Sequence, residues 1–385
     1  MSNFNRLRVA TVCEANPAKN PRPNRVIQTL QKDHELTAIG RHATQIEGVE
    51  VLSYDGPKKR NFWQEIGLYR DVFLRRYERL VFIPTRLKIA EYLDQREFDL
   101  IFCHDLVLLP IVLAHKKSAK VIFDAREFYP KQCEDDWRWK ILFADFNDWL
   151  CRTFLKEVDC AYTVGEGIAQ KYEKEYGVKM STLMSLPLLS HCLPTSRGEG
   201  EKIRLIHHGV ANSNRQIELM IEMMDHVDDR FRLDLMLVKS GREGYYESLM
   251  ERVKERQNVR LIPPVTFEEI IPFINQYDIG LYLLPPTGFN TKYALPNKFF
   301  EFIQARLAIA IGPSPEMARI VQKENLGIIS QDFTPLSMAR ALNQLTHEEI
   351  LAYKQNADRA AKIYNAKENE KILQEVMERA LCQKS

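Results

Sequence analysis

Short apolar runs recur along the whole chain and alternate with stretches whose apolar residues follow helical spacing. The runs are at 7–13, 36–39, 49–53, 100–105, 121–127, 160–164, 203–207, 233–238, 259–262, 279–284, 307–311 and 327–329. Apolar runs without strict alternation are typical of parallel strands that are buried on both faces. Strands that alternate with helices predict βαβ units. The pattern therefore predicts an α/β fold with parallel sheets.

The length of the chain, 385 residues, predicts two domains, because a single hydrophobic core stops growing beyond about 250–300 residues. A stretch rich in Pro, Ser and Gly at 185–200 is typical of a linker between domains. We expect a first domain at 1–190, a linker at 191–202 and a second domain at 203–362.

The composition fits a globular protein and argues against several functional classes. Apolar residues make up 45% of the chain, and the formal net charge of +2 argues against a dedicated nucleic-acid-binding protein. The seven cysteines contain no C-x-x-C pair, which predicts reduced thiols inside the cell. The first residues lack the apolar core of a signal peptide, and no apolar run is long enough to cross a membrane. We therefore expect a cytoplasmic protein.

The segment 58–92 combines basic and aromatic residues and allows two interpretations. It has nine Lys or Arg residues against four Asp or Glu residues, with aromatic residues at 62, 63, 69, 73 and 77. A helix of this composition can lie on an anionic membrane, here the cytoplasmic membrane face, as a peripheral contact. Alternatively, the helix packs its aromatic face on the protein core. We favour the second interpretation, because no lipid-anchor signal or clean amphipathic pattern accompanies the segment.

Polar side chains end two neighbouring strands of the first half. His104 and Asp105 end the first of them, and the second ends in Asp124, Arg126 and Glu127. Because the carboxyl ends of parallel strands form the ligand edge of a doubly wound sheet, we expect these side chains at a binding site. A single histidine at such a position can also be purely structural, so both interpretations stay open for His104.

The stretch 293–320 contains the strongest chemical signal of the chain. Pro296 is suited to open a helix, because it has no N–H to leave without a partner. Asn297, Lys298 and Glu301 then lie near the helix N-terminus, where free backbone N–H groups and the lysine attract phosphate. The carboxylate of Glu301, about one helical turn after Asn297, can accept two hydrogen bonds from a ribose diol. This combination predicts a nucleoside diphosphate site, although an ordinary βα unit with a capped helix would share part of the pattern.

Two motifs in this stretch resemble the donor-site signature of the GT-B glycosyltransferases, in particular the retaining family 4 (glycosyl transferases group 1). They are Pro-Asn-Lys-Phe-Phe-Glu at 296–301 and Glu-Met-Ala-Arg-Ile-Val at 316–321. The strand ends at 104–105 and 124–127 are similar to the H-D and D-x-H-E strand ends of this family, with Arg126 where the family usually has His. The resemblance implies two Rossmann-like, doubly wound domains facing across a cleft, with a terminal segment 363–385 that crosses back to the first domain.

The resemblance also implies roles for individual residues. His104 would lie near the transferred sugar, and the acceptor side would comprise Asp105, Asp124, Arg126 and Glu127. On the donor side, Gly209 would let the backbone approach the ligand, and Arg215 would bind the diphosphate together with Lys298. The remaining donor-side positions are Val265 beside the nucleobase, Tyr293, Leu295, Pro296, Asn297 and Glu301. Tyr293 stands where many relatives carry the first of two glutamates, and Val210 stands where they carry an arginine.

The predicted activity is transfer of a sugar from a nucleoside diphosphate sugar to a glycan or a lipid-linked acceptor, in surface polysaccharide or glycoconjugate synthesis. By the resemblance, the reaction proceeds with retention and needs no metal, and the sequence has no D-x-D motif. We expect His104, Arg215 and Lys298 to be catalytic, with no cofactor besides the donor substrate. Two alternatives stay open: a catalytically silent sugar-nucleotide-binding protein, and a sugar-nucleotide epimerase of the same fold.

Overall fold

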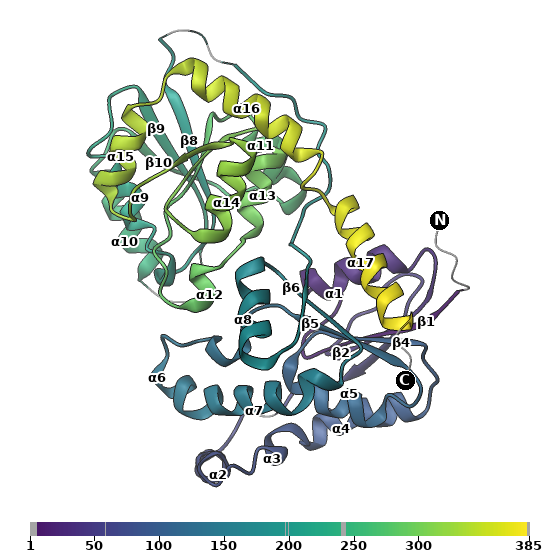
Figure 1. Cartoon of the computed structure of the whole chain (residues 1–385). Coiled ribbons are helices and arrows are strands. Elements are labelled where there is room, and N and C mark those ends of the chain that lie inside the picture. Colours follow the sequence, from purple (N-terminus) through teal and green to yellow (C-terminus); the bar gives the residue numbers. More distant parts are fainter. Residues whose placement is uncertain (1–5, 58, 197, 199, 240–243, 383–385) are drawn as a thin grey trace. The chain divides into compact units, whose positions relative to one another are not determined.

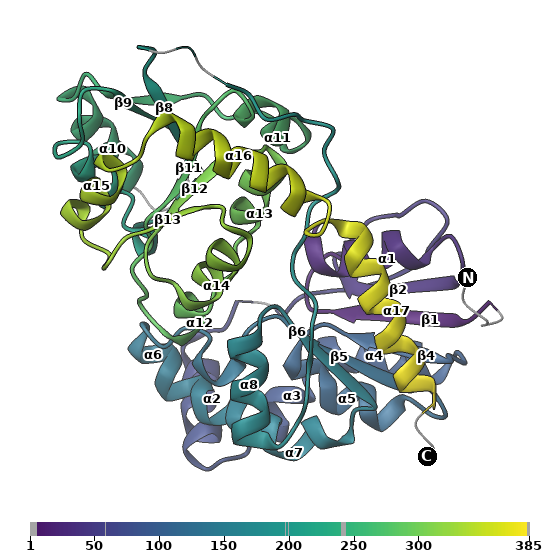
Figure 2. The same cartoon turned by 45° about the horizontal axis from the view of Figure 1, so that its top comes forward.

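The computed structural model describes residues 6–57, 59–196, 198, 200–239 and 244–382. Outside these residues lie positions 1–5, 58, 197, 199, 240–243 and 383–385. Some of them belong to segments discussed above, namely the two termini, the basic segment and the linker. The chain forms two compact units, one of Met1–Met184 with Glu370–Ser385 and one of Ser185–Asn369 (Figures 1 and 2).

The first unit contains a parallel sheet in the order β3-β2-β1-β4-β5-β6-β7. Its strands are β1 (Arg8–Cys13), β2 (Glu35–Arg41), β3 (Glu50–Tyr54), β4 (Leu100–Cys103), β5 (Lys120–Ala125), β6 (Cys160–Thr163) and β7 (Ser181–Thr182). The register aligns Val9 of β1 with Leu36 of β2 and with Leu100 of β4. The strand order therefore runs outward in both directions from the pair β1 and β4, which is the topological switch point of this sheet.

Helices cover the first sheet and extend beyond it. They are α1 (Pro21–Leu30), α2 (Phe62–Phe73), α3 (Glu78–Val81), α4 (Pro84–Asp94), α5 (Leu109–His115), α6 (Trp137–Trp139), α7 (Asp145–Phe154), α8 (Glu166–Tyr176) and α17 (Ala366–Cys382). On one face, α1 and α17 share a core with the central strands, in which Ile27 and Met377 both pack. The C-terminal helix is thus part of the core of the first unit.

The second unit contains a parallel sheet in the order β10-β9-β8-β11-β12-β13. Its strands are β8 (Ile203–Ala211), β9 (Phe231–Lys239), β10 (Val259–Ile262), β11 (Ile279–Tyr282), β12 (Ala308–Ile311) and β13 (Gly327–Ile329). Its helices are α9 (Glu218–Met223), α10 (Tyr245–Lys254), α11 (Ile270–Ile274), α12 (Phe289–Lys292), α13 (Asn297–Gln304), α14 (Pro315–Glu324), α15 (Pro335–Asn343) and α16 (His347–Ala361). Here the switch point lies between β8 and β11.

Close packing of α13 on the second sheet depends on a glycine. A Cβ atom at Gly280 in β11 would lie 2.3 Å from the ring of Phe302 in α13, so any larger residue there would collide with the helix. The opposite face of the sheet packs on α9, α10 and α15, whose apolar side chains form one core with β8 and β9. The position of α13 on the sheet is therefore fixed by direct contact.

The predicted fold class is confirmed, with two parallel, doubly wound sheets. One local interpretation is wrong: the aromatic face of α2 does not pack on the core, because Leu68 is the only buried residue among 62–73. The strand that includes 100–103 also ends earlier than expected, at Cys103, so His104 and Asp105 lie in the following loop. Among the described helices, none combines the length and the apolar character that a membrane crossing requires.

Candidate functional site

Two consecutive histidines lie at the switch point of the second sheet. His207 and His208 lie midway along β8, level with the carboxyl end of the neighbouring strand β11, and both side chains are buried. The ring of His207 stacks on that of Tyr282, with ring centroids 5.8 Å apart. Doubly wound sheets bind their ligands at the carboxyl ends of the strands at such a point.

Lys298 brings a buried charge to the same point. It belongs to the first turn of α13, and only 6% of its surface is exposed. Its Nζ lies 3.2 Å from His207 Nε2 and 5.0 Å from the centroid of the Tyr282 ring. Gly209 has a φ of 130°, and a Cβ atom there would lie 2.8 Å from the same Nζ. Because Gly209 has no side chain, there is room beside it for the ammonium group of Lys298.

The hydrogen bonds of His207 determine which of its ring nitrogens carries the proton. Nδ1 lies 2.9 Å from the carbonyl oxygen of Leu281, which can only accept, so Nδ1 is the donor. Nε2 therefore accepts a hydrogen bond from the ammonium group of Lys298. Burial and the neighbouring charge of Lys298 lower the pKa of His207 well below its ordinary value. His207 is thus a neutral acceptor that holds Lys298 in place.

The second histidine lies beside the predicted ribose-binding carboxylate. His208 Nε2 is 3.3 Å from Glu301 Oε2, and both residues are buried. The two atoms are close, but no well-directed hydrogen bond reaches this nitrogen from the described residues. Burial and Lys298 lower the pKa of His208 to about 3, so its ring is neutral near pH 7. Its ring packs edge-on against Phe302, at 5.4 Å between centroids.

Arg215 adds a second cation to the site. It ends a short 3₁₀ turn, Ser213–Arg215, that follows β8, and its charge partly opposes the rise that burial causes in the pKa of Tyr282. Burial and the charge of Arg215 lower the pKa of Lys298 well below its ordinary value, and Glu301 opposes them only in part. The two cations repel each other in this low-dielectric position, and an anion bound beside both would remove that repulsion. The electrostatics therefore favour phosphate or diphosphate.

The other predicted donor-side residues lie on the segments around this cluster. Pro296 is the N-cap of α13, one position before the helix, which begins at Asn297, and Leu295 is buried. Tyr293 follows α12 and packs its ring on Phe289, at 4.7 Å between centroids. Val265 lies in the loop after β10. The contact of these residues with a donor stays a prediction.

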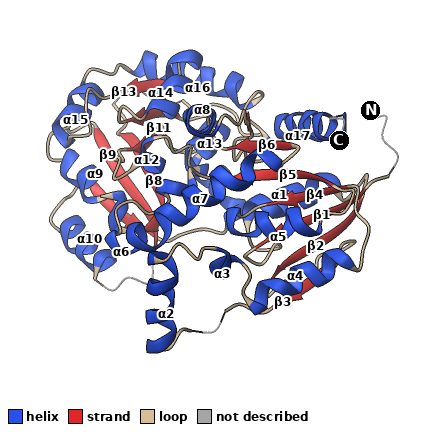
Figure 3. Ribbon diagram, turned by 60° about the horizontal axis from the view of Figure 1, so that its bottom comes forward, coloured by secondary structure: helices blue, strands red, loops and turns tan. Residues whose placement is uncertain are grey.

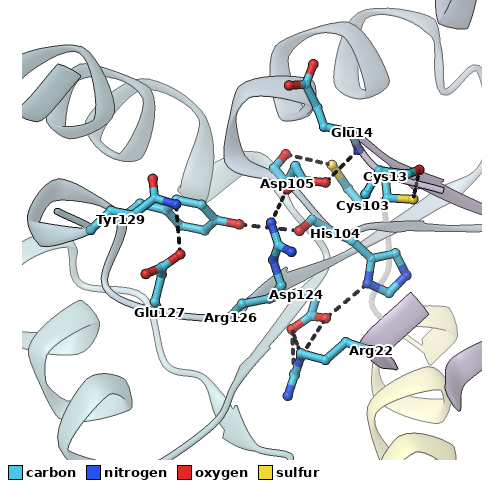
Figure 4. A network of polar contacts seen from close by, with 12 residues as sticks. Cys13, Glu14, Arg22, Cys103, His104, Asp105, Asp124, Arg126, Glu127 and Tyr129 are labelled. Carbon is cyan, nitrogen blue, oxygen red and sulfur yellow. Dashed lines mark hydrogen bonds and ion pairs between the residues drawn. The ribbon is translucent and has the colours of Figure 1, made fainter. Parts of the chain in front are cut away.

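A buried polar network occupies the switch point of the first sheet (Figure 4). His104 is fully buried, and its Nδ1 lies 3.0 Å from Asp124 Oδ2. Arg22 of α1 donates to the same carboxylate, with Nη2 2.6 Å from Oδ1. Burial alone would raise the pKa of Asp124, but Arg22 and His104 outweigh it and bring the pKa to about 2. The ionised carboxylate fixes the proton of His104 on Nδ1, and Nε2 has no hydrogen-bond partner among the described residues.

A second part of this network fixes the loops after β1 and β5. Asp105 forms an ion pair with Arg126 and accepts a hydrogen bond from the backbone N–H of Glu14, at 2.7 Å. The hydroxyl of Tyr129, which lies close to the charge of Arg126, donates to the carbonyl oxygen of His104 at 3.3 Å (Figure 4). Asp105 thus links the loop after β1 to the loop after β5.

Glu127 differs from Asp124 of the same network because its pKa is raised. Burial raises the pKa of Glu127 to about 7, against the opposing effects of Arg126 and of Gln132, whose Nε2 lies 2.9 Å from Glu127 Oε1. A carboxyl group that titrates near pH 7 can donate or accept a proton under ordinary conditions. Glu127 is therefore the member of the predicted acceptor side best suited to proton transfer.

Several residues of these clusters were not among the predicted site residues. Among them are Arg22, His207, His208 and Tyr282. The pair of histidines before Gly209, at the end of the predicted strand 203–207, is a signal that the sequence does contain, because polar residues at the carboxyl end of a buried strand point to the ligand edge. Arg22 has no such signal, since its partner Asp124 is 102 positions away.

Comparison with known proteins identifies the fold. No protein-family model and no curated protein matches the sequence. HepE of Anabaena, solved in complex with UDP-glucose, is 9% identical and superposes with a TM-score of 0.68 over 97% of this chain and 99% of its own. A glycosyltransferase of Rickettsia africae is 10% identical, with a TM-score of 0.70 over 99% of this chain and 100% of its own. The α,α-trehalose-6-phosphate synthase of Burkholderia multivorans is 13% identical, with a TM-score of 0.64 over 96% and 97% of the two chains.

The chain has the GT-B fold. This confirms the fold that the motifs at 296–301 and 316–321 implied. The cluster around Lys298 lies in the second Rossmann-like unit, and the network around His104 lies in the first. Within the described residues, no group of three or more His, Cys, Asp or Glu side chains is arranged to hold a metal ion.

Proposed function

We propose that the protein is a glycosyltransferase that uses a nucleoside diphosphate sugar as donor. The observation that carries this proposal is the buried ammonium group of Lys298, together with the charge of the half-buried Arg215, at the switch point of the second sheet. Two cations that act on each other at one site suit a ligand with more than one negative charge. HepE, which shares the fold, has been solved with UDP-glucose, a ligand of this class.

In the proposed reaction, the bond between the anomeric carbon and the diphosphate oxygen breaks, and the electron pair leaves with the diphosphate. The acceptor oxygen forms the new bond to the same carbon, and its proton moves to the departing phosphate oxygen. The reaction then proceeds with retention on one face of the sugar and needs no protein nucleophile. Lys298, Arg215 and the N–H groups at the start of α13 stabilise the charge of the leaving group.

The remaining residues position the two substrates. Glu301 would accept hydrogen bonds from the ribose hydroxyls, and His207 would keep the ammonium group of Lys298 directed at the diphosphate. His104 would contact the transferred sugar, because its Nε2 is buried and has no hydrogen-bond partner among the described residues. Glu127 would lie on the acceptor side.

We further propose that the acceptor is a glycan or a lipid-linked saccharide, in surface polysaccharide or glycoconjugate synthesis on the cytoplasmic side of a membrane.

A specific observation favours a second candidate function. Tyr293 packs on Phe289 where many relatives carry a glutamate, so a protein that binds sugar nucleotides without turning them over is the alternative.

Release of the nucleoside diphosphate distinguishes the two functions. UDP-, GDP- and ADP-glucose are incubated with the protein in the presence and absence of glycan and lipid-linked acceptors. Acceptor-dependent release of a diphosphate supports transfer, and binding without release supports the silent protein. Conversion of the sugar nucleotide to an isomer without any acceptor, and without net release of the diphosphate, would identify an epimerase. Absence of binding to every nucleotide would overturn the proposal.

A further inference from the structure

Helix α2 presents an apolar stripe to solvent instead of to the core of the first unit. Phe62, Ile66, Tyr69 and Phe73 follow the spacing of one helical face, and they are 72%, 45%, 40% and 86% exposed. Trp63 lies beside this stripe and is 76% exposed. Figure 3 shows α2 at the periphery, away from the strands of the sheet. An exposed apolar face of this kind marks an interaction site.

The helix itself is well formed, so the exposed stripe is a stable surface. Asn61 accepts a hydrogen bond from the backbone N–H of Gln64 at 2.9 Å, and Gln64 Oε1 accepts one from the N–H of Asn61 at 3.0 Å. This reciprocal arrangement satisfies two backbone groups at the start of α2. Because the helix is capped, its exposed aromatic residues keep their relative positions.

The apolar surface continues onto a neighbouring segment. Arg138 of α6 donates to Glu65 Oε2 at 2.6 Å and to the hydroxyl of Tyr69 at 3.0 Å, which fixes α6 against α2. Trp137 of α6 is 72% exposed, and Ile141, in the π-helical turn Lys140–Ala144, is 58% exposed. Aromatic residues thus come from two segments that are joined by direct contacts.

The charges around this surface are strongly positive. The stretch 58–79 contains seven basic and three acidic residues, a net charge of +4, whereas the whole chain carries +2. Both acidic side chains of α2 are matched by arginines: Glu65 by Arg138 and Asp71 by Arg70. Arg75, Arg76 and Arg79 line one surface depression together with Tyr77, Glu78 and Trp149, and Arg79 Nη1 also lies 3.5 Å from Asp71 Oδ1. The excess positive charge next to the stripe therefore includes Arg75 and Arg76.

We propose that α2, α6 and the arginines at 75–79, here called the α2 surface, bind a membrane surface that contains anionic lipids. Aromatic side chains favour the boundary between lipid headgroups and acyl chains, and arginine binds lipid phosphates. An anionic lipid surface offers both complements at once, acyl chains for the aromatic stripe and phosphates for the arginines, and this match favours the lipid as the partner. The inference does not depend on the proposed sugar transfer, because the contact requires no nucleotide.

Sedimentation with lipid vesicles tests the α2 surface directly. The full-length protein is mixed with vesicles of phosphatidylcholine alone, and with vesicles that contain about 30% phosphatidylglycerol, a fraction chosen to give a strongly negative surface. No nucleotide is added, so failure here is distinguishable from failure of the proposed sugar transfer. We expect binding to the anionic vesicles, weak binding to the neutral ones, and loss of binding at high salt, which screens the charges.

Two double variants separate the apolar and the electrostatic contributions. Phe62→Ser with Phe73→Ser should lower the partition coefficient about 30-fold or more, because both rings lose a partly buried position in the lipid. Arg75→Gln with Arg76→Gln should lower it about 30-fold on anionic vesicles only. All four side chains are exposed, so the unfolding temperature should not change.

Matched controls use residues that lie away from the α2 surface. Phe267→Ser replaces a phenylalanine that is 65% exposed in the second unit, and Lys32→Gln with Lys174→Gln removes two exposed cations of the first unit. These controls should bind vesicles as the unchanged protein does.

Fluorescence quenching by brominated lipid tests the position of Trp63 on the membrane. Brominated lipid should quench the fluorescence of Trp63, and Trp63→Phe should remove that part of the quenching.

Three results would overturn the proposal. The first is absence of vesicle binding, or equal binding to neutral and anionic vesicles. The second is an equal loss in the control variants. The third is a concentration-dependent dimer that the Phe62 and Phe73 substitutions abolish, because the surface would then be covered by a second copy of this chain.

Discussion

Replacing Lys298 by Met tests the role assigned to the buried ammonium group. Met has a similar volume without the charge, so the packing of α13 should change little. A hydrogen bond from an ammonium group to a phosphate oxygen contributes about 1.5–3 kcal/mol, which corresponds to a loss of about 10- to 150-fold in affinity for a nucleoside diphosphate. Because charge on the leaving group grows in the transition state, kcat should fall further, by about 100- to 1,000-fold.

The same substitution should leave the stability of the ligand-free protein nearly unchanged. The pKa of Lys298 is lowered in the folded protein, so the unfolded state holds the proton more tightly and the charge opposes folding below the unfolded-state pKa. Replacing a buried charge by an apolar group can stabilise by about 1–4 kcal/mol, and leaving His207 Nε2 without a donor costs about 1–3 kcal/mol. The free energy of unfolding should therefore change by less than about 2 kcal/mol, or about 8 °C in Tm for a unit of this size.

Lys354→Met is the matched control for this experiment. Lys354 is a second buried lysine of the same unit, and its Nζ lies 2.8 Å from Thr195 Oγ1, 2.8 Å from the carbonyl oxygen of Tyr277 and 3.5 Å from Asp278 Oδ1. Removing one member of a buried ion pair costs about 3–5 kcal/mol, so this variant should lose stability but keep its nucleotide affinity.

Calorimetric titration with UDP, GDP and ADP measures the nucleotide affinity of each variant, and thermal unfolding measures its stability. The reasoning is refuted if Lys298→Met binds the diphosphate as tightly as the unchanged protein, or if it unfolds as easily as Lys354→Met.

Substitutions at four further positions test other parts of the two clusters. Glu301→Gln should lower nucleotide affinity about tenfold, as expected for a charged hydrogen bond, and should abolish the preference for a ribose over a 2′-deoxyribose nucleotide; an unchanged preference in a competition assay would exclude the ribose contact. His207→Phe should lower kcat more than it raises KM, with partial recovery in His207→Gln, whose side-chain oxygen can accept from the lysine; equal kinetics for Phe and Gln would exclude a positioning role. Because the pKa of Glu127 is raised to about 7, a rate that depends on its ionisation changes near this pH, and Glu127→Gln should remove that change from the pH profile of transfer. Arg22→Met should lower the free energy of unfolding by about 3–5 kcal/mol near pH 7. Since the folded-state pKa of Asp124 is depressed to about 2, this difference should be present above the unfolded-state pKa of about 3.9 and disappear as the pH falls toward 2 in chemical denaturation; a difference that persists there would contradict it.

The fold and the donor-side helix could be predicted from local sequence patterns. Apolar runs identify strands that are buried on both faces, and helix α13 is specified by Pro296 at its cap and by the spacing of Lys298 and Glu301. Each of these signals lies within a few consecutive residues. The strands and the start of helix α13 can be predicted from the sequence because the residues that define them are neighbours in the chain.

Contacts between distant segments could not be predicted in the same way. The hydrogen bond between Lys298 and His207 spans 91 positions, and no local pattern indicates which buried group meets which. The exposed stripe of α2 illustrates a second limit. Helical spacing of the aromatic residues predicts one apolar face, but only the packing of the surrounding elements determines whether that face is covered.

The central claim is that the cations at the switch point of the second sheet bind the diphosphate of a sugar nucleotide. A titration of the unchanged protein and of Lys298→Met with UDP-, GDP- and ADP-glucose, followed by heat release, tests this claim most directly. We predict saturable binding of at least one sugar nucleotide to the unchanged protein and a loss of affinity of about tenfold or more in the variant. Equal binding by both proteins, or no binding of any sugar nucleotide, would contradict the account.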